Sequence, residues 1–201
     1  GFYYKPRVDI DELKKYSDGI IALSACLAGD ISQALMDRNY EKAKNIALQY
    51  RDIFGEGNFY LEIQDHGLPE QKEVNAALVK LSKEINIPLV ATNDIHYVNK
   101  EDSKIHDVLM CIQMGKTVND PNRMRFGSDE FYLKSREEME ELFPYAPEAI
   151  DNTVKIAEMC NIEFDFNTIH LPKYDVPEGY TPDTYLLKVL KKDMIIQAKK
   201  L

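Results

Sequence analysis

The 201-residue chain has only three cysteines, four histidines and no tryptophan, and it carries no excess of positive charge. An odd number of widely spaced cysteines excludes a disulfide framework and favours a reducing compartment, so we expect a cytoplasmic protein. The sequence also lacks a charged-then-apolar leader and any run of about 18 apolar residues, so neither secretion nor membrane spanning is predicted. Since 25 Lys and Arg oppose 34 Asp and Glu, the net charge is −9, and we expect this chain alone to bind DNA weakly.

The sequence does contain apolar runs that alternate with segments of helical period, which is typical of a parallel α/β sheet or barrel. Three of the apolar runs are predicted strands: residues 20–23, 59–63 and 88–91. Three segments between and after them are predicted helices: 40–54, 69–85 and 99–115. The third helix carries an apolar stripe that we expect to be buried, formed by Ile105, Val108, Leu109 and Ile112.

The alternation stops after a polar loop over residues 118–127. A short strand is predicted next, and it is followed by a helix whose start is marked by Ser135 and Glu138, a capping-box pair. Pro147 is expected to open a longer helix that extends to Cys160. The remaining predictions are a strand over 131–133, a connector over 161–182 and a final helix from Pro182 to the end.

Residues able to bind metal or move protons follow each predicted strand. Cys26 follows the first strand, His66 the second, and Asp94 and His96 the third. The carboxyl ends of parallel strands meet at one edge, and side chains two apart on an extended segment point to the same side. A thiolate, a carboxylate and an imidazole suit zinc or a similar divalent ion, which generates hydroxide for attack on a phosphoester.

Structural roles for the same residues compete with this prediction. Cys26 can be a small buried hydrophobe, and Asp94 can orient the imidazole of His96 in a capped turn. A turn-stabilising role for His66 is as well supported as a functional one. The other candidates are ambiguous or favour structure: His106 with Asp102 four residues before it, His170 without a motif, and Arg123 and Arg125, which can meet phosphates or pair with carboxylates.

Five blocks of sequence, in this order, closely resemble the alpha subunits of bacterial replicative DNA polymerase III: residues 23–29, 59–67, 90–97, 131–135 and 147–153. The resemblance implies that residues 1–130 are the later part of a PHP (polymerase and histidinol phosphatase) domain, a distorted β/α barrel. Residues 131–201 would finish that domain and lead, mostly as helix, into the polymerase palm. Gly1 to Tyr4 form an apolar cluster without an initiator methionine, which predicts that the sequence begins inside a longer chain.

The resemblance also implies a partial metal site. Cys26 matches a late cysteine ligand, while Asp94 and His96 match an Asp-x-His pair, in a cluster that binds zinc or manganese in family members. The early ligands would precede Gly1, and the palm aspartates that hold magnesium for polymerisation are absent from this sequence. Implied partners are the rest of the polymerase chain, a proofreading subunit, the sliding clamp and DNA.

Three functions are therefore open. The chain can be part of a polymerase whose PHP domain hydrolyses phosphoesters, as in 3'→5' proofreading, or part of a non-catalytic PHP scaffold that braces the polymerase and docks partners. A free-standing PHP phosphatase fits the strand-end residues but not residues 131–153, which resemble the lead into a palm. No polymerisation is expected from this chain alone.

Overall fold

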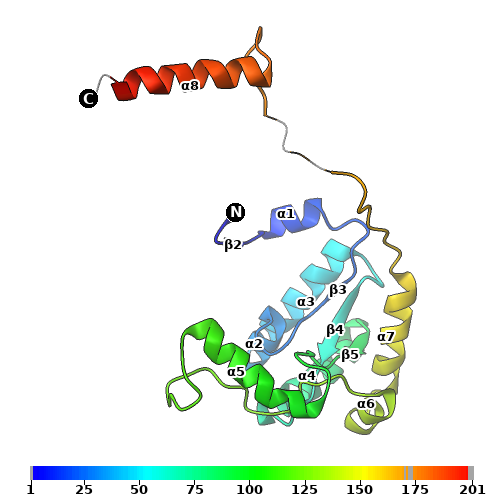
Figure 1. The fold of residues 1–201 in the computed structure, drawn as a ribbon. Helices are drawn as coiled ribbons and strands as arrows, with labels where there is room; N and C mark the ends of the chain where they lie inside the picture. The colour runs from blue at the N-terminus through cyan, green and yellow to red at the C-terminus, as the bar shows by residue number, and fades with distance from the viewer. Residues whose placement is uncertain (1, 170, 172–173, 199–201) are drawn as a thin grey trace. The chain divides into compact units, whose positions relative to one another are not determined.

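The computed structural model describes residues 2–169, 171 and 174–198, and the chain divides into two compact units, Gly1–Cys160 and Asn161–Leu201 (Figure 1). The first unit contains the sheet and most of the helices. In the second, α8 (Pro182–Ala198) follows residues 161–181, which contain no helix or strand in their described part. His170 and the end of the predicted last helix, residues 199–201, lie outside the described residues.

A parallel sheet of three strands forms the centre of the first unit (Figure 1). The strands are β3 (Ala22–Leu23), β4 (Phe59–Ile63) and β5 (Leu89–Ala91), in the order β3-β4-β5. Both pairings are parallel, with Ala22 opposite Phe59 and Leu61 opposite Leu89. The α/β class and all three predicted strands are confirmed, although β3 begins at Ala22 rather than at residue 20.

Helices α2 (Asp30–Met36), α3 (Tyr40–Phe54) and α4 (Pro69–Ile85) pack with one face of this sheet. Asn39 caps α3 by accepting a hydrogen bond from the Lys42 backbone amide, and Pro69 opens α4 where a missing N–H costs nothing. The sequence did not predict α2, which is only seven residues long. Alternate residues of β4 enter the core that these elements share: Phe59, Leu61 and Ile63.

Two further helices follow, and the second of them packs against β5. They are α6 (Arg136–Leu142), capped by the predicted Ser135–Glu138 box, and α7 (Pro147–Met159). The buried amide of Asn152 on α7 donates to the Leu89 carbonyl of β5 at 2.7 Å. A backbone carbonyl on an edge strand can otherwise pair with a strand of another molecule. Because Asn152 already occupies the Leu89 carbonyl, α7 protects this edge.

Before the sheet, the chain forms a short antiparallel pair, β1 (Phe2–Tyr3) and β2 (Lys5–Pro6), and then α1 (Ile10–Lys15). Asp9 caps α1 by accepting a hydrogen bond from the Glu12 amide at 2.9 Å. None of the helices in the described part of the chain is both long enough and apolar enough to cross a bilayer.

The predicted helix over residues 99–115 is present as η1 (Lys100–Asp102) and α5 (Ser103–Met114), but the predicted burial of its stripe is wrong. Ile105, Leu109 and Ile112 are 61%, 57% and 70% exposed, and Val108 is exposed as well. The other side of α5, with Cys111, faces the protein instead. The predicted strand over 131–133 is reduced to one bridge between Tyr97 and Tyr132.

Candidate functional site

The carboxyl ends of the three strands lie at one edge of the sheet because all three strands are parallel. β3 and β5 flank β4, however, and two strand spacings amount to about 10 Å. Within the described residues, no group of three or more His, Cys, Asp or Glu side chains is arranged to hold a metal. Cys26, Asp94 and His96 therefore do not form a ligand set in this structure, and their role as metal ligands stays a prediction.

Asp94 and His96 are joined by a local hydrogen bond, and the backbone at Asp94 is not extended. Asp94 has a left-handed backbone, with φ of 43°, so the expectation that extended geometry aligns the two side chains is wrong. The His96 Nδ1 donates to the Asp94 carbonyl oxygen at 2.6 Å. Because a carbonyl only accepts, this bond places a proton on Nδ1, so in the neutral imidazole Nε2 carries the lone pair that a metal-binding histidine uses.

Aromatic rings surround the imidazole of His96. Phe126 lies 4.8 Å from it between ring centroids, His106 lies at 5.4 Å and Phe131 at 5.5 Å. His106 was expected to pair with Asp102, but the recorded side-chain bonds of Asp102 go to Asn99. The two histidines are therefore neighbours, although ten residues separate them in the sequence.

Cys26 is half-buried beside a different group of side chains. It lines a cavity of about 10 Å³, room for at most one water molecule, together with Glu62 and Gln64. The Glu62 carboxylate accepts hydrogen bonds from Gln64 Nε2 and from the Thr92 hydroxyl. The buried Gln64 Oε1 has no hydrogen-bond partner among the described residues.

The turn that carries Cys26 is tight. Ala25 is left-handed, with φ of 64°, and the Gly29 amide donates to the Cys26 carbonyl at 2.9 Å. A Cβ on Gly29 would stand 2.4 Å from the Ser24 carbonyl oxygen, so only glycine fits there. The conformation of the turn that carries the Cys26 thiol therefore depends on the absence of a side chain at Gly29.

His66 has a structural role in the fold. It is 1% exposed, its Nε2 donates to the Asn93 carbonyl at 2.8 Å, and its Nδ1 accepts from the Gln71 amide at 2.7 Å. The Gln71 Oε1 accepts from the His66 backbone amide, and the imidazole stacks on Phe131 at 3.9 Å. Burial lowers the pKa of His66, which favours the neutral ring. With both ring nitrogens engaged, His66 joins the ends of β4 and β5.

Two ion-pair networks hold the segment after α5. Arg123 forms a bidentate pair with Asp107, which confirms the paired interpretation of this arginine and lowers the pKa of the Asp107 carboxyl. Lys100 and Lys134 both reach Glu130, and the hydrogen bond from Lys100 is the main cause that lowers the pKa of Glu130. Sequence patterns did not predict the Glu130 network, because Lys100 is 30 residues from Glu130, although Lys134 is only four residues away.

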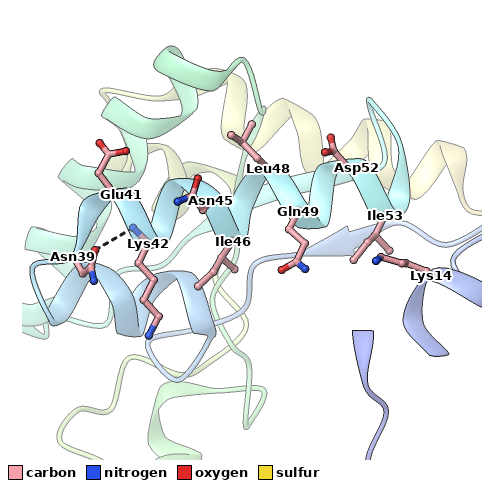
Figure 2. A pocket seen from close by; sticks show the side chains of 10 residues that line it. All are labelled: Lys14, Asn39, Glu41, Lys42, Asn45, Ile46, Leu48, Gln49, Asp52 and Ile53. Atoms are coloured by element: carbon pink, nitrogen blue, oxygen red, sulfur yellow. Dashed lines mark hydrogen bonds between the residues drawn. The ribbon is translucent and has the colours of Figure 1, made fainter. Parts of the chain in front are cut away.

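A large pocket of about 990 Å³ lies elsewhere, along the exposed face of α3 and beside Lys14 of α1 (Figure 2). Amide and charged side chains line much of it, among them Asn45, Gln49 and Asp52. None of the predicted metal ligands contributes to it. Its chemistry does not add to the candidate site.

Comparison with known proteins tests the family resemblance found in the sequence. A family described as PHP domain matches residues 1–66. A DNA polymerase III subunit alpha from Treponema pallidum is 44% identical over 190 residues, which cover 94% of this chain and 16% of the relative. The chain matches one segment of the DNA polymerase III alpha subunit.

Other relatives of that name agree. The subunit from Borreliella burgdorferi is 48% identical over 178 residues, covering 88% of this chain and 15% of the relative. The subunit from Thermus aquaticus is 44% identical over 192 residues, covering 92% of the chain and 16% of the relative. The resemblance deduced from the five sequence blocks is confirmed, and the chain spans about one sixth of the length of these relatives.

Proposed function

We propose that this chain is part of a replicative DNA polymerase III alpha subunit. The supporting observation is identity of 44–48% along about nine tenths of the chain to proteins of that name. In this proposal residues 1–130 are the later part of a PHP domain, and residues 131–201 complete it and lead into the palm. The three-stranded parallel sheet would then be one portion of a distorted β/α barrel.

DNA-templated synthesis would belong to the full polypeptide, in the cytoplasm. Magnesium would be held there by palm carboxylates outside this sequence. The partners would be the remainder of the polymerase chain, the proofreading subunit, the sliding clamp and DNA. The net charge of −9 argues that the strong DNA contacts lie outside these 201 residues.

Primer extension tests the assignment. The full-length protein should extend a primed template with magnesium, whereas the 201-residue chain purified alone should add no nucleotide beyond a mock-purified control. Fluorescence anisotropy at low salt should show weak DNA binding by the chain. A full-length protein without template-dependent synthesis, or sub-micromolar DNA binding by the chain alone, would contradict the proposal.

For the PHP portion, we propose that Cys26, Asp94 and His96 contribute to a site for zinc or manganese with ligands from outside this sequence. The Nε2 of His96, which has no hydrogen-bond partner in the described part of the chain, supports this role. Such a metal, once bound, supplies an activated water for phosphoester hydrolysis. The described residues do not by themselves assemble a complete site, so the contribution of this chain is limited to ligands and their orientation.

The alternative is a PHP scaffold without hydrolytic activity. The bonds of His66 favour it, since the most deeply buried histidine at the strand ends uses both ring nitrogens within the fold. The two possibilities differ in one measurement on the full-length protein, the excision of a mismatched 3' nucleotide. Excision by the wild type that is lost in Asp94→Asn would support hydrolysis, whereas no excision by the wild type, or excision that Asp94→Asn leaves unchanged, would support the scaffold.

A further inference from the structure

A cleft beside His96 combines positive charge with an aromatic wall. It has a volume of about 440 Å³ and lies between α5 and residues 123–129. Phe126 and His106 line it, and both rings also contact the ring of His96. A molecule in the cleft would therefore lie next to the predicted metal ligand.

Two of the cationic side chains that line the cleft form no ion pair with a described residue. Three cationic side chains and two carboxylates contribute to it: Lys104, Arg123, Arg125, Asp107 and Asp129. Asp107 forms its ion pair with Arg123 and is attracted only at longer range by Arg125, and Asp129 lies 3.7 Å from Lys100 outside the cleft. Neither Lys104 nor Arg125 forms an ion pair within the described part of the chain, and the one hydrogen bond recorded for Arg125 is a long contact of 3.4 Å to the Val118 carbonyl.

Such a group of donors matches one ligand chemistry best. Guanidinium and ammonium groups donate without accepting, and a phosphate group accepts through several oxygens while carrying the opposite charge. The planar fork of an arginine suits two phosphate oxygens at once. The ring of Phe126 offers an apolar surface for whatever carries the phosphate, such as a nucleoside.

We propose that this cleft binds a phosphate group through Arg125 and Lys104, beside the aromatic wall of Phe126. The relation to catalysis rests on the proposed hydrolytic role of His96, because a phosphoester held here would lie against that residue. Phosphate binding itself requires only the cleft. The phosphate can come from free inorganic phosphate or from a nucleotide at the end of a DNA strand.

Equilibrium dialysis of the full-length protein against radiolabelled inorganic phosphate, and separately against thymidine 5'-monophosphate, tests the proposal. Both are measured with EDTA, so that a metal-bound phosphate does not contribute. We expect saturable binding that Arg125→Gln weakens about tenfold, as loss of a charge-assisted hydrogen bond should. Arg38→Gln, the same change at an exposed arginine between α2 and α3, should leave binding unchanged.

The remaining outcomes distinguish a nucleotide from inorganic phosphate as the ligand, and failure of this proposal from failure of the proposed function. Tighter binding of the nucleotide than of phosphate, with the gain lost in Phe126→Leu, would identify a nucleotide ligand, and equal affinities would identify free phosphate. Arg125→Lys, which keeps the charge, should retain part of the affinity and guards against misfolding of the glutamine variant. No saturable binding in EDTA, or equal binding by Arg125→Gln and Arg38→Gln, would overturn the proposal. A normal metal content in that case would leave the proposed function intact.

Discussion

The end of β4 around His66 and the face of α5 around His96 lie close in the sequence but differ in how their polar and apolar groups are used. Both ring nitrogens and the backbone amide of His66 are hydrogen-bonded inside the protein. Among the described residues no side chain or backbone group hydrogen-bonds to the Nε2 of His96, and the outer stripe of α5 is exposed. The polar groups of the first region therefore stabilise the fold, whereas the second region retains a ring nitrogen and an apolar surface that can bind a ligand.

The difference shows that a histidine at a strand end is not by itself a functional residue. Both histidines follow a parallel strand, and Phe131 contacts both rings. The two histidines differ in how many ring nitrogens are hydrogen-bonded. Both nitrogens of His66 have partners, whereas within the described residues only the Nδ1 of His96 has one. The following predictions test whether the two regions also differ in their contribution to the free energy of unfolding.

The largest expected effect is in the core beneath β4. Leu61→Ala should lower the free energy of unfolding of the chain by about 3 kcal/mol, because Leu61 is fully buried and its removal leaves a cavity. Ile112→Ala, on the exposed stripe of α5, should change it by less than about 0.5 kcal/mol. Urea denaturation followed by circular dichroism measures both. A cost above about 1.5 kcal/mol for Ile112→Ala would show that the stripe is packed.

The next largest effect is a difference in stability between alanine variants of His66, which is buried, and His106, which is half-buried. His66→Ala leaves the Gln71 amide and the Asn93 carbonyl without partners, so a loss of about 2 kcal/mol is expected. His106→Ala removes ring contacts at 5.2–5.6 Å and a weak attraction to the Asp107 carboxylate, and it should cost less than about 1 kcal/mol. The same denaturation experiment compares them. Equal losses would remove the proposed distinction between the two regions.

The lowered pKa of His66 predicts an acid-sensitive term in stability. The unfolded state takes up a proton near pH 6.5, whereas the folded state resists protonation, so the unfolding free energy should fall as the pH drops below about 6.5. One group contributes at most about 1.4 kcal/mol per pH unit. The difference between wild type and His66→Asn, measured from pH 8 to 5, isolates this term from other groups. A difference independent of pH would contradict it.

A smaller effect is expected at the start of α6. Ser135 accepts a hydrogen bond from the Glu138 amide while Glu138 accepts one from the Ser135 amide. Ser135→Ala should cost about 1 kcal/mol, and Ser135→Asp should retain most of the stability. Thermal unfolding of the two variants provides the comparison. Identical melting temperatures for the alanine variant and wild type would show that this cap contributes nothing.

Sequence patterns predicted the elements whose causes are local. The cap at Ser135, the helix start at Pro69 and the apolar run of β4 all act within a few residues. Burial on α5 was not predictable, because an apolar stripe reveals a face without showing whether the fold supplies a partner for it.

The candidate site was predictable only in its residue types. The left-handed backbone of Asp94 and the position of β4 between the strands that precede Cys26 and His96 depend on tertiary structure. The bonds of His66 likewise join residues from three segments. Spacing along the sequence carries none of this information.

The most direct test of the account is the metal content of the full-length protein and its variants, measured by inductively coupled plasma mass spectrometry alongside excision of a mismatched 3' nucleotide. Asp94→Asn and His96→Ala should each lower bound zinc or manganese and excision together. Asp65→Asn changes a carboxylate whose recorded bond is to the Gly67 amide, and it should preserve both. Undiminished metal and excision in Asp94→Asn and His96→Ala would contradict the account.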